Sequence, residues 1–281
     1  MIYHAEQVTS NARLFADDTA IDRKIKSKDD QACLQADLDS LAEWEKQWDM
    51  SFHPDKCQVL QVSNKKIKLD FSYQLHKQNL QVVHSTKYLG VTIQDDAKFD
   101  SHISNIANAG NKMLGFTRRN LRVNSKSSRE QAYKMLVRPK VEYAAAVWDP
   151  YTKEQIQNIE KIQRRAARFV SNDHRQTSSV TEMLRALDWP TLEARREAAR
   201  LTTLYKIDSG DVKIKSANLQ PAPSRSRRTH DKQFTRHQCH KDIRLNSFFP
   251  RTIKQWNSLP QQTVSAPSAD AFHQRVLRAA C

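Results

Sequence analysis

The spacing of hydrophobic residues changes along this chain, from runs typical of β-strands near the N-terminus to the three-and-four spacing of helices afterwards. Two short apolar runs, at 14–16 and 19–21, flank a pair of adjacent aspartates, and this pattern predicts a β-hairpin with the pair at its tip. The next segment predicts an amphipathic helix, with Ser27 and Asp30 as a capping box at its start. Its apolar face consists of Leu34, Leu38, Leu41, Trp44 and Trp48.

Strand patterns return after this helix. A turn around Pro54 leads into a predicted strand at 57–62. Two further runs, at 71–75 and 80–93, are separated by the polar residues 77–79 and predict a second hairpin. The first hundred residues are therefore expected to combine one long helix with several short strands.

From about residue 102 to 208 the pattern is helical and contains no strand-like run. A first helix is expected around 103–114, and a second runs from 130 into Pro139, which should end or kink it. A third covers 156–169, and a fourth is expected to begin near Pro190, because proline is favoured in the first turn of a helix. These four patterns predict a compact helical domain.

The composition shifts beyond this domain. Residues 209–240 are rich in serine, proline, arginine and lysine and predict a basic linker. Helical spacing returns twice near the C-terminus, at 249–256 and at 272–276. The predicted fold class is α+β and mostly helical, with four segments at 1–100, 101–208, 209–240 and 241–281.

The charge balance favours a polyanionic partner. The 281 residues contain 46 lysines and arginines against 31 aspartates and glutamates, so the formal net charge is +15 and the pI is near 9.7. The four cysteines lack paired spacing, which indicates neither a disulfide framework nor a zinc cluster and favours a reducing, intracellular compartment. No apolar run approaches the ~20 residues that span a bilayer, and the N-terminus lacks the apolar core of a signal peptide.

The adjacent Asp17 and Asp18 have two interpretations when taken alone. Aspartate is common in turns because its side chain hydrogen-bonds the nearby backbone. Carboxylate oxygens are also the ligands that Mg²⁺ requires. A turn is the commoner outcome for so short a pattern, and the rest of the chain has to decide between the two.

Several separate segments, taken in order, resemble the C-terminal half of a reverse transcriptase from a non-LTR retrotransposon of the jockey-like or CR1-like kind. The segments are FADD, HPDKC and KYLGV, followed by AYKMLVRPKVEYAAAVWDP, IEKIQRRAARFV, SVTEMLRALDWPTLEARR and SFFPRTIKQWNSLP. The resemblance extends from about residue 10 to 275. It implies the C-terminal part of a polymerase palm in residues 1–100, a helical thumb in 101–208, and a C-terminal extension.

The resemblance also implies roles for individual residues. FADD matches the motif whose aspartates help to hold two Mg²⁺ ions for in-line attack of the primer hydroxyl on the incoming nucleotide, with Asp17 as direct ligand and Asp18 in a supporting place. Lys56 matches a basic residue that neutralises or protonates the departing pyrophosphate. The primer-grip hairpin is matched by Tyr88, Leu89 and Gly90.

A stripe of cations on the predicted thumb helix is a candidate for contact with nucleic-acid phosphates. A solvated helix face explains such a stripe equally well. The stripe consists of Lys161, Arg164, Arg165 and Arg168.

Two places depart from a simple match. Asp22 stands where the family often has an aromatic residue, which puts the packing of the second strand in doubt. A cluster in the predicted linker lacks the spacing of a zinc site, and we interpret it as exposed residues that face a polyanion. The cluster consists of His230, His237, Cys239 and His240.

The family's fingers, its earlier palm strand with another metal-binding aspartate, and its endonuclease domain do not fit into the 14 residues before FADD. We therefore expect a truncated RNA-directed DNA polymerase that binds RNA and DNA and is inactive alone, because two Mg²⁺ ions need more carboxylates than one pair. The alternatives are a non-catalytic basic helical protein that binds nucleic acid, or a mobile-element relic without function. The family implies a place in the nucleus or cytoplasm and no membrane partner.

Overall fold

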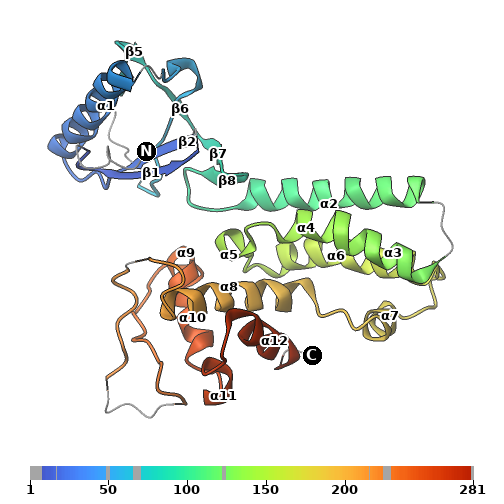
Figure 1. Ribbon diagram of the computed structural model, residues 1–281. Coiled ribbons are helices and arrows are strands. Elements are labelled where there is room, and N and C mark those ends of the chain that lie inside the picture. Colours follow the sequence, from blue (N-terminus) through green and yellow to red (C-terminus); the bar gives the residue numbers. More distant parts are fainter. Residues whose placement is uncertain are drawn as a thin grey trace. The chain divides into compact units, whose positions relative to one another are not determined.

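The chain folds into two units, residues 1–98 and 99–281, and helices outweigh strands (Figure 1). The computed structural model describes residues 8–16, 18–48, 51–65, 71–121, 125–214, 216–223 and 229–279. Within these ranges the strands form four two-stranded sheets. The fold is therefore a mixture of helices and small sheets, as predicted, and the assignment of palm and thumb stays a prediction.

The first unit combines one long helix with short strands and a 3₁₀ turn. The helix α1 spans Lys28–Trp48. The other elements are β1 Asn11–Phe15, β2 Asp18–Asp22, η1 Pro54–Lys56, β3 Gln58–Leu60, β4 Gln74–Leu75, β5 Gln78–Asn79, β6 Gln81–Val83, β7 Ser85–Tyr88 and β8 Val91–Gln94.

The predicted capping box at the start of α1 is confirmed. The Asp30 backbone N–H donates to Ser27 Oγ at 3.3 Å, and the Ser27 N–H donates to Asp30 Oδ2 at 3.0 Å. These two bonds satisfy donors that a helix N-terminus leaves free. The apolar face of the helix, including Leu34 and Leu38, then packs on a small core around Tyr73, Leu75 and Leu80.

The predicted long strand at 80–93 is wrong in its extent. It is divided into β6, which pairs in parallel with β3, and the antiparallel hairpin β7–β8. The chain changes partners at His84, whose carbonyl accepts from the Asp95 N–H at 2.9 Å and whose ring nitrogen lies 3.0 Å from the Asp95 carboxylate. The second hairpin forms, but with other bounds than expected. β4 pairs with β5, so residues 78 and 79, which were expected in the turn, belong to a strand.

The second unit is helical, and its described residues 102–208 contain no strand. Its longest helices are α2 Asp100–Asn120, α6 Lys153–Ser171 and α8 Leu192–Asp208. The shorter elements are α3 Lys126–Ala132, the π-helical η2 Tyr133–Val137, α4 Arg138–Glu142, α5 Ala145–Trp148, α7 Val180–Ala186, α9 Asp242–Leu245, α10 Phe248–Trp256, α11 Gln261–Val264 and α12 Ala269–Ala279.

The helix that contains Pro139 does not end there. Proline lacks an N–H, and its ring crowds the carbonyl four residues earlier. The chain accommodates this with the π-helical turn η2, where the Arg138 N–H reaches back to the Tyr133 carbonyl. The helix then continues through α4 and ends at Glu142, and Ala144 adopts a left-handed conformation with φ of 52°.

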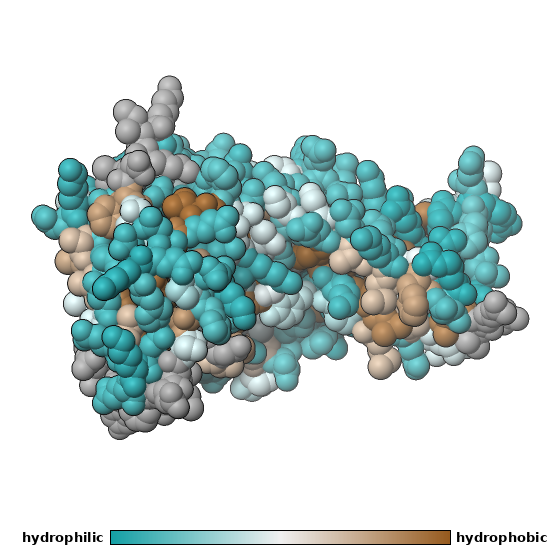
Figure 2. All heavy atoms as spheres, turned by 90° about the horizontal axis from the view of Figure 1, so that it is seen from above, coloured by the Kyte–Doolittle hydropathy of each residue, from teal (hydrophilic) through white to brown (hydrophobic). Residues whose placement is uncertain are grey.

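The helices of this unit pack in two adjoining groups, one around α2 and one around α8. α2 packs against η2, α4 and α6, and α8 packs against α5, α6, α10 and α12 (Figure 1). Trp256 and Phe272, both fully buried, are central to the second group. Hydrophilic side chains cover most of the face drawn in Figure 2, in keeping with the 27% charged residues. Within the described ranges, we find no helix with the length and apolar character needed to cross a bilayer.

Part of the segment predicted as a basic linker is packed against α10. His230 is buried, and its Nε2 lies 2.9 Å from the Trp256 carbonyl oxygen. The Phe234 N–H donates to Asn257 Oδ1 at 3.0 Å, and Asn257 Nδ2 donates to the Phe234 carbonyl at 2.7 Å. The expectation that His230 is exposed is therefore wrong, because its ring packs edge-on against the buried Trp256, with the ring centroids 6.1 Å apart.

Candidate catalytic hairpin and nucleic-acid interface

The FADD segment forms a tight β-hairpin. β1 and β2 are antiparallel, with Phe15 opposite Asp18, so the connection contains two residues. Ala16 begins it with a φ of 52°, the left-handed conformation that two-residue hairpin turns require. Asp17 lies outside the described residues. Asp18 is the first residue of β2, and its side chain is exposed. Among the described residues it has no hydrogen-bond or ion-pair partner, so its carboxylate is available to a ligand.

Asp22 ends the second strand and has a clear place in it. It lies opposite Asn11, whose Nδ2 donates to its carboxylate at 3.1 Å, and it forms an ion pair with Arg13. A cross-strand polar pair therefore stands where an aromatic residue was expected. β2 forms through to Asp22, so this departure does not prevent the strand from pairing with β1.

The base of the hairpin is tied to α1 by Asp37, a residue that the sequence analysis did not identify. The carboxylate is buried and accepts from the backbone N–H groups of Thr9 at 2.8 Å and Ser10 at 2.9 Å. Burial acts to raise the pKa of Asp37, but hydrogen bonds from Ser10 and Thr9 outweigh it and the pKa is lowered. This contact orients the hairpin on the helix.

The remaining predicted palm residues lie on two other elements. Lys56 ends the 3₁₀ turn η1 and is exposed, and none of the described side chains bonds to it. Tyr88 ends β7, and Leu89 and Gly90 form the two-residue turn to β8 with φ of 46° and 81°. A left-handed leucine is strained, whereas glycine adopts this conformation freely. Gly90 therefore marks a turn rather than a bulge.

The cations of α6 divide into two groups. Arg165 donates to Asn111 Oδ1 at 2.7 Å, and half-buried Arg168 donates to the carbonyls of Arg175 at 2.7 Å and Ser178 at 3.3 Å. These bonds hold α6 to α2 and to the loop that follows α6. Lys161 and Arg164 are exposed, and neither has a hydrogen bond or ion pair within the part of the chain that the structure describes.

The opposite face of α6 is fixed in place by buried contacts. Ile159, Ile162 and Ala166 are fully buried. Buried Gln163 accepts from the Tyr133 hydroxyl at 3.0 Å and donates to the Pro190 carbonyl at 2.8 Å. Because the buried face is held on several sides, the exposed cations project from a fixed scaffold.

A buried cluster of arginines around Asp149 was also missed. Arg196 Nε lies 2.9 Å from Asp149 Oδ1, and Arg200 pairs with the other carboxylate oxygen. Arg251 lies 3.3 Å from Asp149 and also donates to its backbone carbonyl at 3.0 Å. Burial lowers the pKa of Arg200. One carboxylate thus joins the end of α5 to α8 and α10.

Within the described ranges, no group of three or more His, Cys, Asp or Glu side chains is arranged as a metal site would need. Cys239 Sγ is 3.6 Å from the His237 carbonyl, and His237 and His240 are exposed. His230 is engaged with α10. The predicted metal and nucleic-acid residues therefore stay predictions, spread over the hairpin tips and the exposed side of α6.

Comparison with known proteins supports the resemblance to a reverse transcriptase of a mobile element. The chain is 26% identical over 161 residues to the RNA-directed DNA polymerase from mobile element jockey of Drosophila melanogaster. This similarity covers 56% of the chain and 18% of the relative, so the chain spans less than a fifth of the relative's length. No family model and no solved structure matches the chain.

Proposed function

We propose that this chain is part of a reverse transcriptase of a non-LTR mobile element and that its helical unit holds the template–primer. The similarity to the jockey RNA-directed DNA polymerase carries the proposal. The order of the elements supports it, because a carboxylate-tipped hairpin, a long helix and a second tight hairpin precede the helical unit. The unit 1–98 would then be the end of a palm and the helical unit would include the thumb.

Lys161 and Arg164 are the proposed phosphate contacts of the thumb. Both are exposed on α6, and in the described ranges no carboxylate neutralises either of them. Arg165 and Arg168 instead hold α6 to its neighbours. Phosphate contacts from cations position a nucleic acid without reading its bases, so the expected binding tolerates any sequence.

The hairpin tip is the proposed contribution to the Mg²⁺ site. The exposed carboxylate of Asp18 has the oxygen chemistry that Mg²⁺ prefers, and Asp17 would provide the second carboxylate. When bound, the ions align the primer hydroxyl and neutralise the charge that develops on the phosphates. Lys56 would offset the charge of the leaving pyrophosphate, and the β7–β8 turn would approach the primer backbone.

Binding of a DNA duplex as a function of salt tests the thumb assignment. Fluorescence anisotropy would compare the chain with the double variant Lys161→Ala/Arg164→Ala. Each duplex phosphate contact that is lost should reduce the slope of log affinity against log salt by about 0.9. The matched control is Lys206→Ala/Lys213→Ala, which removes two exposed charges elsewhere in the same unit.

The proposal predicts a smaller slope for the α6 variant and a nearly unchanged slope for the control. Equal slopes for the two variants would show that Lys161 and Arg164 belong to a solvated helix face and do not contact phosphates. Absence of binding by the unmodified chain, even at low salt, would contradict nucleic-acid binding by these 281 residues.

A further inference from the structure

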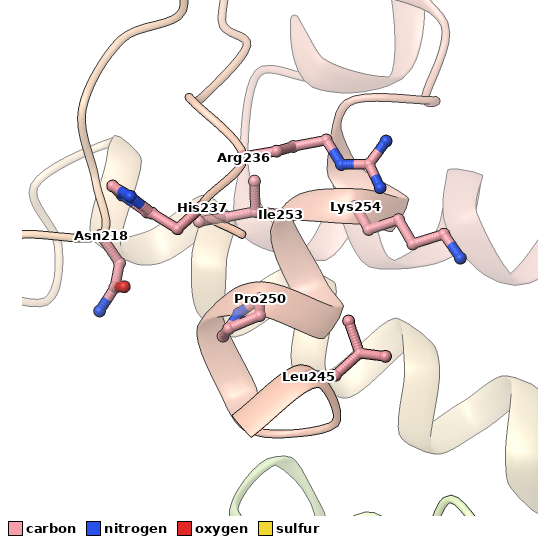
Figure 3. A pocket seen from close by; sticks show the side chains of 7 residues that line it. All are labelled: Asn218, Arg236, His237, Leu245, Pro250, Ile253 and Lys254. Atoms are coloured by element: carbon pink, nitrogen blue, oxygen red, sulfur yellow. The ribbon is translucent and has the colours of Figure 1, made fainter. Parts of the chain in front are cut away.

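A small pocket in the C-terminal part of the helical unit is lined by basic side chains and has no role in the function proposed above. Its volume is about 30 Å³. Leu245, Pro250 and Ile253 form the apolar part of its lining. Arg236 and Lys254 extend on one side of it, and His237 and Asn218 lie on the other (Figure 3).

The two cationic side chains of this pocket, Arg236 and Lys254, are not neutralised by neighbouring side chains. Within the described ranges, Arg236 and Lys254 have neither an ion pair nor a hydrogen bond, and no carboxylate lines the pocket. The nearby Lys232 differs, because its Nζ lies 3.3 Å from Asp208. Charge is therefore concentrated at the pocket and is available to an anion.

The backbone that leads into Arg236 is held by two neighbouring segments. Phe234 forms two hydrogen bonds with the Asn257 side chain, at 3.0 and 2.7 Å. The Thr235 N–H donates to the Gln220 carbonyl at 2.7 Å, and its hydroxyl donates to the Pro221 carbonyl at 3.0 Å. The backbone position of Arg236 is thus fixed, although its side chain is exposed.

Lys254 and part of the apolar lining are held by α10. Ile253 and Trp256 of this helix are buried, with exposed fractions of 2% and 0%. The Trp256 Nε1–H donates to the Lys232 carbonyl at 2.7 Å, which fastens α10 to the segment before Arg236. Buried contacts, rather than a contact between the two cations, therefore fix the segments that carry Arg236 and Lys254.

We propose that this pocket binds a phosphate group. The guanidinium of Arg236 can donate two hydrogen bonds to phosphate oxygens, and Lys254 supplies a second positive charge. His237 and Asn218 offer further polar groups. A volume of about 30 Å³ corresponds to roughly two water positions, at about 10–15 Å³ each. It therefore has room for the oxygens of a phosphate group.

Two sources present the same chemistry, a nucleic-acid backbone and a free phosphate ion or monoester. The phosphate group in the pocket comes from a nucleic-acid backbone if the chain binds nucleic acid, and that part of the inference rests on the proposed function. In that case the pocket adds a contact beyond those of α6. The binding of phosphate itself does not depend on the proposed function.

The first experiment titrates the full chain with inorganic phosphate at constant ionic strength. The His237 imidazole signal in the NMR spectrum, identified as the one lost in His237→Gln, reports occupancy. The expected result is a saturable shift in the unmodified chain and in the control Lys206→Ala/Lys213→Ala. The variant Arg236→Ala/Lys254→Ala should bind at least tenfold more weakly. A shift that does not saturate, or equal binding by the pocket variant, would overturn the proposal.

The second experiment measures the salt dependence of duplex binding by the same variants. Loss of one backbone contact in Arg236→Ala/Lys254→Ala should reduce the slope by about 0.9, and inorganic phosphate should compete at the pocket. An unchanged slope together with saturable phosphate binding would assign the pocket to a free phosphate or monoester. If the unmodified chain binds no duplex, the proposed function fails, and the phosphate titration alone decides the proposal for the pocket.

Discussion

Gly110 provides a direct test of how α2 packs in the helical unit. A Cβ atom at this position would lie 2.6 Å from Val141 Cγ1 on α4 and 3.0 Å from Ile162 Cδ1 on α6. Both neighbours are fully buried, so neither can move without disturbing other core side chains. The glycine therefore permits the close approach of three helices. The matched position is Gly115 of the same helix, where a Cβ would meet only the flexible end of Arg119, at 3.3 Å.

The expected effects of alanine at the two positions differ in the cost of packing the added methyl group. Replacing glycine by alanine inside a helix stabilises it by about 0.5–1 kcal/mol. At Gly110 the added methyl group also overpacks the core, which costs about 1–3 kcal/mol. The helix term is shared by both variants, so Gly110→Ala should be less stable than Gly115→Ala by about 1–3 kcal/mol.

Urea unfolding followed by circular dichroism measures this difference, and hydrogen exchange of the α2 amides assigns it to the helical unit. Gly115→Ala should be at least as stable as the unmodified chain. If Gly110→Ala were as stable as Gly115→Ala, the close packing of α2 on α4 and α6 would be refuted.

Three further predictions concern carboxylates. Asp149→Asn should lower the free energy of unfolding by about 3–5 kcal/mol, because it leaves buried Arg196 and Arg200 without their counter-charge. Urea unfolding measures this change. The control is Asp242→Asn at an exposed position, which should stay within about 0.5 kcal/mol of the unmodified chain. Folding lowers the pKa of Asp37, so the stabilisation from its carboxylate is present above the unfolded pKa of about 3.9 and is lost as the pH falls through the folded value. In Asp37→Asn, the free energy of unfolding should therefore depend less on pH on the acid side. An unchanged dependence on pH would contradict this role. The purified 281-residue chain should show no Mg²⁺-dependent primer extension, since the proposed pair supplies too few carboxylates for two ions, and extension that is abolished by Asp17→Ala would refute this.

Local structure was largely predictable from the sequence. The capping box of Ser27 and Asp30 and the three-and-four spacing of α1, α2, α6 and α8 are short-range patterns, and each helix forms where its pattern lies. The hairpin at FADD also follows from neighbouring residues. The long strand expected at 80–93 was wrong because the exchange of partners at His84 depends on Asp95 and on β3, which local spacing does not reveal.

The sequence alone also pointed to the resemblance to a reverse transcriptase and to the candidate residues, through the order of FADD, HPDKC, KYLGV and the helical segments. It could not separate Lys161 and Arg164 from Arg165 and Arg168, since all four have the same charge and lie within eight residues of one helix. Tertiary structure separates them. Asn111 and the carbonyls of Arg175 and Ser178 engage two of these cations, and the other two have no hydrogen bond or ion pair among the described residues.

Only the tertiary structure decided the contacts that join distant segments. Arg251 lies about a hundred positions after Asp149, yet it donates to the Asp149 carbonyl, and no periodic pattern connects two such positions. The pocket between Arg236 and Lys254 likewise exists because Asn257 and Trp256 fasten an apparently linker-like segment to α10. Periodicity determines which face of a helix is buried, because that depends on neighbours three and four residues away; the choice of partner for each face, and the placing of charges around it, depends on how the whole chain packs.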